Sequence, residues 1–587
     1  MSLGKRHIKA KAKAKDKDMA ASKAKDVAAS KDGASADAPG SGRSPPRHPP
    51  RQRPAAAGWA AIAIGFVATS VMLASVVRLG PQYLEAVYGN VLSQQWFAHG
   101  MAGSVAAGAG LGWAFWRRGA GGGAAGDARV ARGVAAGLDA AALLTALAPW
   151  RTAQLFRASR WLGPAWGPVV THVSLAGPAG AACGFVAAVS AARVARSSRA
   201  AAAAYVGALA AAAAAWDGRL AGDALGGCGG LLAVAGVAAA GSLAVRALGG
   251  CAAWRAAAVA AGVAVGVGVA TLATDPRCAR GVTARNNSDA AYHMLARGES
   301  ATGWVSVSDE AARGLRVLRS GHSIIGGHWN ATRESIFGVF YYADAVRLVL
   351  APPRAQERAL VIGLGIGVAA RSLHERGVRV DVVELDAAVY DAAVRFFALP
   401  RALNAVFLQD ARRFIDAAPP AAYDYVVHDV FTGGSVPPAL FSLSAVEHLR
   451  RILAPHGVLA MNYVGVLGDR RTLLHVAHTL RAAFAHVRCF AESTDDPDAA
   501  TNMMFFASPD PIAFAPGALR AAADPESIRG VVLAAMEANE VSLAYDGPPL
   551  RPITDAWNPL PRWLAPAAVA HWHAMRGMFP DSYWLNY

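Results

Sequence analysis

Cysteine is scarce in this chain of 587 residues. The five cysteines form no CxxC pair, and no histidines lie beside them at the spacing of metal ligands. The pattern therefore predicts neither a structural zinc site nor a disulfide framework, and no metal is expected. The five are Cys183, Cys228, Cys251, Cys278 and Cys489.

Large apolar residues are nearly absent from residues 1–57, which consist mainly of Lys, Ala, Asp, Ser and Pro. Such a composition cannot form a core, so we expect a disordered tail. The tail has fourteen Lys and Arg against five Asp, a net +9 of the whole-chain +16. Because no aromatic residues are interleaved with these charges, no nucleic acid partner is expected. A basic arm before an apolar segment favours a cytoplasmic N-terminus and contact with membrane lipid.

Charge is absent from Gly58 to Val77, a run of 20 residues that is long enough to cross a bilayer as an α-helix. Further charge-poor windows follow, and together they predict a multi-span α-helical membrane region over residues 58–274 with six or seven spans. These windows consist mostly of Ala and Gly, whose transfer free energies are near zero, so a soluble Ala-rich helical array is the alternative. The further windows lie near 98–116, 133–149, 168–192, 200–216, 225–245 and 256–273.

Few ionisable residues lie within or beside these windows, chiefly His99, Asp139, His172 and Asp223. A carboxylate inside a membrane is a candidate functional group. Both aspartates are equally compatible with positions at helix ends that face water, so they predict no transported substrate.

After Asp275 the long apolar runs end and shorter alternating segments begin. Residues 280–345 contain extended segments and Gly-rich turns, which predict a small β subdomain. Residues 346–508 alternate short apolar strands with helices and predict a doubly wound, Rossmann-like α/β domain, followed by a C-terminal extension over 509–587. The strands of the α/β domain are expected at 358–363, 378–384, 405–409, 423–429, 457–463, 486–490 and 502–507.

Glycines follow the first of these strands directly. Gly363, Gly365 and Gly367 open a helix, so the backbone can approach a ligand without a Cβ in the way. Glu384 ends the second strand, 21 residues beyond Gly363, where a carboxylate can accept hydrogen bonds from both hydroxyls of a ribose. Together they predict a nucleoside-type cofactor over the turn, and a sheet without a cofactor is the alternative.

Two aspartates end the next two strands. Asp410 closes the third strand in QDARRFI, from where it can accept from an adenine amino group. Asp429 closes the fourth in YDYVVHDVFTGG and is suited to hold or deprotonate an amine nucleophile, with helix capping or loop ordering as its alternative role. We expect His428 to pack rather than react, while His322 and His328 are as compatible with loop positions as with catalysis.

At these residues the domain resembles the polyamine synthases, the spermidine and spermine synthases that move an aminopropyl group from decarboxylated S-adenosylmethionine to a diamine. The resemblance covers roughly residues 290–510, is closest to membrane-fused, synthase-like members, and rests on VIGLGIG, VVELD, QDARRFI, YDYVVHDVF and LAPHGVLAMNY. It implies a class I methyltransferase-type fold. It also implies that Glu384 holds the ribose, that Asp410 and Ala411 hold the adenine, and that Asp429 is the general base on the attacking amine.

The resemblance is incomplete at two positions. The glycine loop of spermidine synthases reads GGGDGG, and its Asp holds the aminopropyl amine, whereas the matching residue here is Ile366. The family's D-x-x-D-P loop becomes Asp429-Val-Phe-Thr432-Gly, which loses the second carboxylate. Each missing counter-ion leaves a charge of a cationic substrate uncompensated. The tail segment ITDAWNPL resembles one that follows the domain in fused members, so Asp555 is expected near the site.

Three functions are compatible with these residues. The first is a membrane-anchored aminopropyltransferase that uses decarboxylated S-adenosylmethionine and a small-molecule amine. The second is a methyltransferase that uses S-adenosylmethionine, and the third is a catalytically idle domain that senses a nucleoside. A homo-oligomer is also compatible with the sequence.

The number of spans determines the location of the catalytic domain. Because S-adenosyl cofactors are cytosolic, we expect a multi-pass membrane protein with six spans and a cytoplasmic catalytic domain. An odd number would instead expose the sequons that begin at Asn286 and Asn330 to glycosylation.

Overall fold

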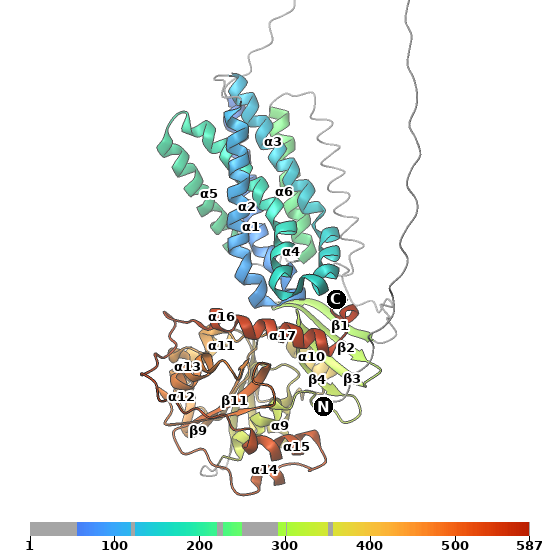
Figure 1. Ribbon diagram of the computed structural model, residues 1–587, viewed down its shortest axis with the longest axis vertical. Coiled ribbons are helices and arrows are strands. Elements are labelled where there is room, and N and C mark those ends of the chain that lie inside the picture. Colours follow the sequence, from blue (N-terminus) through green and yellow to red (C-terminus); the bar gives the residue numbers. More distant parts are fainter. Residues whose placement is uncertain are drawn as a thin grey trace, which may run out of the picture. The chain divides into compact units, whose positions relative to one another are not determined.

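The computed structural model describes residues 56–118, 124–219, 227–248, 292–300, 302–349, 356–431 and 433–585, and the statements below concern these ranges. Six long helices come first (Figure 1). They are α1 (Ala56–Tyr88), α2 (Asn90–Arg117), α3 (Ala124–Ala146), α4 (Ala148–Ala195), α5 (Arg199–Arg219) and α6 (Gly227–Leu248).

Each of the first six charge-poor windows falls on one of these helices, while the window at 256–273 lies outside the described residues. Glycines allow the helices to approach closely. A Cβ added to Gly108 of α2 would lie 1.8 Å from the carbonyl oxygen of Ala181 in α4, and one added to Gly184 of α4 would lie 2.0 Å from that of Val105. The predicted helices are therefore confirmed, and small residues form their closest contacts.

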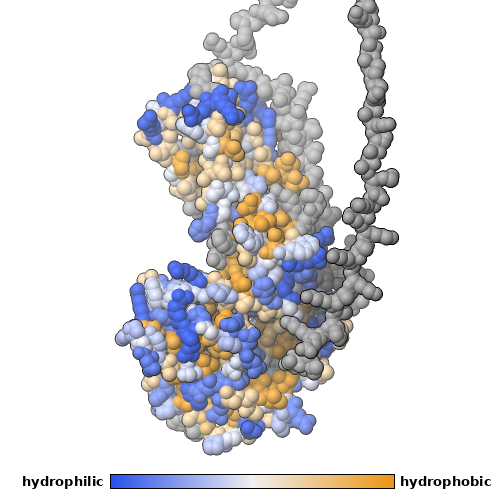
Figure 2. Space-filling model, viewed as in Figure 1, coloured by the Kyte–Doolittle hydropathy of each residue, from blue (hydrophilic) through white to orange (hydrophobic). Residues whose placement is uncertain are grey.

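The expectation of six or seven membrane spans is not supported. Within the described residues only Ala176–Ala195, at the end of α4, is both long and apolar enough to cross a membrane. The apolar parts of α1, α5 and α6 within the described residues are shorter. The helices nevertheless expose large hydrophobic side chains, and Figure 2 shows hydrophobic residues along them. These side chains are Trp59, Val67, Leu111, Trp113, Leu143, Trp161, Trp166, Val173 and Val206.

Of the two aspartates singled out in this region, Asp223 lies outside the described residues. Asp139 lies within α3 and forms an ion pair with Arg246 of α6, and it also accepts a hydrogen bond from Ser242. Its carboxylate thus joins two helices. Cys183, the cysteine of α4, is buried as a free thiol.

A four-stranded antiparallel sheet follows, with its strands in chain order. Its strands are β1 (Tyr292–Ser300), β2 (Gly303–Glu310), β3 (Leu315–Ser320) and β4 (Ser323–Trp329). A short helix, α8 (Val339–Tyr342), and a 3-10 turn, Ala343–Arg347, follow this sheet. The chain becomes extended after that turn, because Val349 pairs with Phe514 as an isolated bridge.

The second sheet has seven strands in the order β10-β11-β9-β8-β5-β6-β7. Strands β7, β6, β5, β8 and β9 are parallel, and β11 and β10 add antiparallel pairs. The strands are β5 (Arg358–Ile362), β6 (Arg379–Glu384), β7 (Ala405–Leu408), β8 (Tyr423–His428), β9 (Leu453–Val466), β10 (His486–Ala491) and β11 (Ala500–Ser508). The connecting helices are α9 (Val368–Glu375), α10 (Ala387–Phe396), α11 (Ala411–Ala417), α12 (Leu443–Ile452) and α13 (Arg470–Arg481).

This strand order confirms the predicted Rossmann-like fold. The chain builds outward from β5 to β6 and β7, and then returns to β8 on the other side of β5. The direction of winding therefore reverses between β5 and β8, and open α/β sheets bind ligands beyond the carboxyl ends of their strands at such a switch point.

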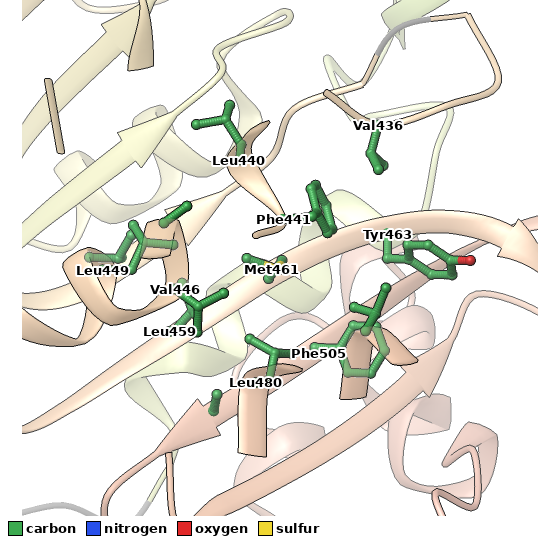
Figure 3. Packing of buried hydrophobic residues seen from close by; sticks show 14 of the residues in the cluster. Val436, Leu440, Phe441, Val446, Leu449, Leu459, Met461, Tyr463, Leu480 and Phe505 are labelled. Carbon is green, nitrogen blue, oxygen red and sulfur yellow. The ribbon is translucent and has the colours of Figure 1, made fainter. Parts of the chain in front are cut away.

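Apolar side chains cover both faces of this sheet. Along β5, Leu360 and Ile362 point to one core, and Ala359 and Val361 point to the other, as the two-residue period of a strand requires. Figure 3 shows part of the first core, where residues of β9 pack against α12 and against the segment that follows β8. Its labelled residues are Val436, Leu440, Phe441, Val446, Leu449, Leu459, Met461, Tyr463, Leu480 and Phe505.

The C-terminal extension adds short helices to the α/β domain. Residues of α15 join the second core, and residues of α16 and α17 join the first. These helices are α14 (Ala518–Ala521), α15 (Ile528–Ala535), α16 (Leu560–Trp563), α17 (Ala565–Met578) and α18 (Asp581–Leu585).

Replacing Leu459 by Ala tests the core of Figure 3. The side chain is fully buried, so its loss is expected to lower the free energy of unfolding by about 2–5 kcal/mol. Leu408→Ala is the control, because that side chain is 49% exposed and should change stability by no more than about 0.5 kcal/mol. Thermal unfolding of the full chain measures both, and equal losses would contradict the assigned core.

Candidate active site

The glycine turn after β5 has a backbone conformation that is strained for residues other than glycine. Gly363, Gly365 and Gly367 have φ values of +80°, +53° and +81°. A Cβ added to Gly363 would lie 2.0 Å from the carbonyl oxygen of Asp429, and one added to Gly365 would lie 2.9 Å from that of Ile325. The turn is therefore enclosed on two sides by backbone.

Glu384 lies beside this turn, at the end of β6. Its Oε2 accepts a hydrogen bond from the Leu364 backbone N–H at 2.9 Å, and its Oε1 accepts one from the Asp386 N–H at 2.8 Å. Burial raises the pKa of the carboxyl group, and the two backbone donors act in the opposite direction. Since each carboxylate oxygen has two lone pairs, Glu384 can still accept hydrogen bonds from ribose hydroxyls. The geometry fits the predicted cofactor contact.

Asp410 follows β7, the strand beside β6, so it lies at the same edge of the sheet. It is exposed and caps α11, where its Oδ1 accepts a hydrogen bond from the Arg413 N–H at 2.9 Å. Helix capping, which was considered from the sequence for Asp429, is thus the role that Asp410 has in the structure. Ala411 packs into the core. Binding of adenine by these two residues stays a prediction.

Asp429 lies at the switch point. Its backbone N–H donates to the Ile362 carbonyl at 2.8 Å, and its Oδ1 accepts from Asn462 Nδ2 at 2.8 Å. Burial raises the pKa of Asp429 to about 6, and the hydrogen bond from Asn462 acts in the opposite direction. A carboxylate with this pKa can accept a proton near neutral pH.

Asn462 was not predicted from the sequence as a site residue. It lies on β9, next to β8, and only 3% of it is exposed. Its signal is the polar residue inside the apolar strand LAMNYV, because a buried amide requires a partner. The sheet register supplies that partner, since Met461 pairs with His428 and Asn462 therefore follows beside Asp429.

The histidines considered from the sequence are packed rings. His428 is fully buried and meets Phe441 edge-on at 5.2 Å, as expected. His322 lies in the turn between β3 and β4, as one of the two alternatives predicted, whereas His328 lies in β4, and both rings are buried. His322 packs against Trp572 and Trp584. Burial, followed by nearby arginines, lowers the pKa of His328 to about 4.

Asp555 lies near α11 rather than at Asp429. Its carboxylate forms an ion pair with Arg412 at 3.2 Å and accepts from Ser444 Oγ at 2.5 Å. Hydrogen bonds from Ser442 and Ser444, together with Arg412, lower its pKa to about 2. Because Arg412 is two residues beyond Asp410, Asp555 braces the expected adenine side of the site. Among the described residues, no group of three or more His, Cys, Asp or Glu could hold a metal ion.

Part of the chain is similar to known proteins. Residues 340–512 match the family described as Spermine/spermidine synthase domain. An N-terminal histidine N-methyltransferase of Emericella nidulans is 34% identical over 342 residues, which are 51% of this chain and 60% of that protein. Polyamine aminopropyltransferase 2 of Streptomyces coelicolor is 33% identical over 201 residues, 32% of this chain and 34% of that protein. The chain therefore spans less than two thirds of either relative.

Solved structures show weaker overall similarity. A probable spermidine synthase from Corynebacterium glutamicum aligns with a TM-score of 0.34 and 19% identity, covering 40% of this chain and 85% of that one. Human methyltransferase-like protein 13, in complex with SAH, aligns with a TM-score of 0.24 and 21% identity, covering 37% and 93%.

Glu384→Ala tests the ribose contact. Hydrogen bonds to a charged acceptor contribute about 1.5–3 kcal/mol, so binding of S-adenosylmethionine should weaken about 10-fold to 100-fold. Calorimetric titration of the full chain measures the change. Glu375→Ala on α9 is the control, since that side chain is 63% exposed and should leave affinity unchanged. Undiminished affinity in Glu384→Ala would remove the basis for this contact.

The pKa of Asp429 predicts the pH dependence of group transfer. The rate should rise as the pH passes about 6 and then level off, because only the ionised carboxylate accepts a proton. Asn462→Ala removes a donor that favours the ionised form, so this limb should move to higher pH. Asn404→Ala is the control, because that amide contacts Asp381 instead. A rate that does not change between pH 5 and 8, a range of about one to two units on either side of 6, would exclude Asp429 as the base.

Proposed function

We propose that the spermine/spermidine synthase domain of this chain transfers the methyl group of S-adenosylmethionine to a nitrogen atom of its acceptor. The observation that carries this proposal is the apolar side chain of Ile366 in the glycine turn. Ile366 is only 5% exposed and packs with Val305, Val307 and Leu318. It also faces Gly326, where an added Cβ would lie 2.7 Å from Ile366 Cγ2.

This hydrocarbon wall favours one cofactor over the other. The aminopropyl group of decarboxylated S-adenosylmethionine carries an ammonium, and Ile366 gives it no counter-ion. The methionyl end of intact S-adenosylmethionine carries a carboxylate as well, so its net charge is zero. Loss of the family's anchoring Asp is therefore more compatible with methyl transfer than with aminopropyl transfer.

The acceptor we propose is the N-terminal histidine of a protein or peptide. Support comes from the Emericella nidulans relative, whose similarity extends over half of this chain. A neutral imidazole has one nitrogen with a free lone pair and one N–H, so it can act as a nucleophile and then release a proton. A small diamine would require the second carboxylate of the D-x-x-D-P loop, which this sequence lacks.

The site residues suggest how the reaction proceeds. When bound, S-adenosylmethionine supplies a methyl carbon; the acceptor lone pair forms the N–C bond while the C–S electron pair returns to sulfur. Glu384 would hold the ribose, and the glycines of the turn would let the cofactor lie close to the backbone. Asp429 accepts the proton that the methylated nitrogen heterocycle releases, with Asn462 orienting its carboxylate. Positioning supplies most of the rate, because a sulfonium is already a good leaving group.

Aminopropyl transfer is the second candidate. It is supported by the family match over residues 340–512 and by the Streptomyces coelicolor relative. Ile366 and the missing second carboxylate oppose it.

We further propose that α1–α6 lie in a membrane. The exposed tryptophans and aliphatic residues of these helices support this location, as does the segment Ala176–Ala195. The basic residues of the N-terminal tail would favour an anionic lipid surface. A cytoplasmic catalytic domain stays a prediction.

Label transfer by the purified full chain distinguishes the candidates. The chain is given methyl-labelled S-adenosylmethionine, or decarboxylated S-adenosylmethionine labelled in its aminopropyl group. The acceptors are a peptide that begins with His, the same peptide N-acetylated, and a diamine. We expect the methyl label to reach only the peptide with a free N-terminal His. Aminopropyl label on the diamine would establish the second candidate, and binding without transfer would leave only a sensor.

A further inference from the structure

Helix α17 lies outside the matched residues 340–512, yet it touches the loop that follows Asp429. Gly434 of this loop has a φ of +93°. A Cβ added there would lie 2.6 Å from Ala568 Cα and 2.9 Å from His571 Cβ. The loop therefore rests directly on the helix, with no room for a side chain between them.

His571 of α17 contacts two other segments. Its ring meets Phe431 of the Asp429 loop edge-on, with centroids 5.0 Å apart. Its Nε2 lies 3.1 Å from Ser323 Oγ, at the start of β4. Burial lowers the pKa of His571 to about 4, so the ring is neutral at physiological pH. A neutral ring can keep the hydrogen bond to Ser323 over the whole range in which Asp429 ionises.

Strand β4 connects His571 to the glycine turn. Two residues beyond Ser323, the carbonyl oxygen of Ile325 closes over Gly365. The next residue, Gly326, packs against Ile366. One end of β4 is thus bound to His571, and its middle covers the glycine turn.

The Asp429 loop requires such support. Gly433 and Gly434 both have positive φ values, and glycine backbones are permissive. The loop is held at its start by the Asp429 N–H bond to Ile362 and after its end by Val436, which is buried in the core of Figure 3. Between these points, Val430 packs against the first core, and a Cβ added to Gly89 would lie 3.5 Å from the Gly433 carbonyl oxygen. His571 and Ala568 add contacts to Phe431 and Gly434.

We infer that His571, paired with Ser323, is a positioning residue that holds the loop after Asp429 against the glycine turn. The inference rests on the proposed methyl transfer for its effect on rate, but the contacts themselves do not depend on it. The C-terminal extension would then complete the active site of the domain. We call the contacts of His571 with Ser323 and Phe431 the clamp. Without these contacts, Asp429 would sample positions away from the acceptor nitrogen, and a displacement of about 1 Å can lower a rate 100-fold.

Three substitutions in the full chain test this role. His571→Phe keeps the ring but removes the hydrogen bond, His571→Gln keeps a side-chain amide within reach of Ser323, and Ser323→Ala removes the partner. We expect His571→Phe and Ser323→Ala each to lower kcat at least about 10-fold, with partial rescue in His571→Gln, while the Kd for S-adenosylmethionine changes less than about twofold. The double variant of His571→Phe and Ser323→Ala should be no slower than either single variant, because each substitution removes the same hydrogen bond. His573→Ala, an exposed neighbour on α17, is the matched control.

Hydrogen exchange gives a readout that does not require activity. In His571→Phe the amides of residues 430, 431 and 433–436 should exchange at least about 10-fold faster, while those of the glycine turn stay unchanged. This result together with an inactive wild-type chain would overturn the proposed function and keep the clamp. Unchanged exchange in the loop would overturn the clamp, as would equal losses of kcat and cofactor affinity with a lowered melting temperature, since that pattern indicates a merely structural residue.

Discussion

The ends of β5 and β8 approach so closely that only glycine fits between them. A side chain at Gly363 would collide with the Asp429 carbonyl, and the Asp429 N–H is bonded to the last residue of β5. This contact lies where the winding of the sheet reverses, so it joins the turn that would receive the cofactor to the carboxylate that would receive the proton. Glu384 and Asn462 come from the strands on either side of this pair. These four groups therefore come from four adjacent strands of the sheet.

The two carboxylates differ because their surroundings differ. Glu384 accepts from two backbone N–H groups, which act against the rise in pKa that its burial causes. Asp429 accepts from one side-chain amide, and burial raises its pKa to about 6. A group with a pKa near neutral pH can gain and lose a proton during turnover. The two carboxylates therefore differ in the donors that stabilise their charge.

A match to a domain family over part of the chain does not by itself decide which group is transferred here. The matched domain, the strand order and the ribose carboxylate are compatible with methyl or aminopropyl transfer alike. Under the proposed function the difference would lie at Ile366 of the glycine turn, which is packed among aliphatic side chains. A wall of this kind cannot compensate an ammonium, so the electrostatics of one position carry more information about the reaction than the fold does.

The sequence alone determined the elements of the α/β domain and three of its strand-end residues. Short apolar segments that alternate with helices predicted each strand of the seven-stranded sheet, and with them the positions of Gly363, Glu384 and Asp429 at strand ends. The roles of these three residues stay predictions. Periodicity is a local property, and these features are local. Only the tertiary structure showed that Asn462 donates to Asp429, that Asp410 caps a helix, that Asp555 lies by α11, and that α17 supports the Asp429 loop. The cap at Asp410 is local and involves the Arg413 N–H, whereas the contacts of Asn462, Asp555 and α17 join residues far apart in the chain. No spacing in a sequence records which distant surfaces will meet.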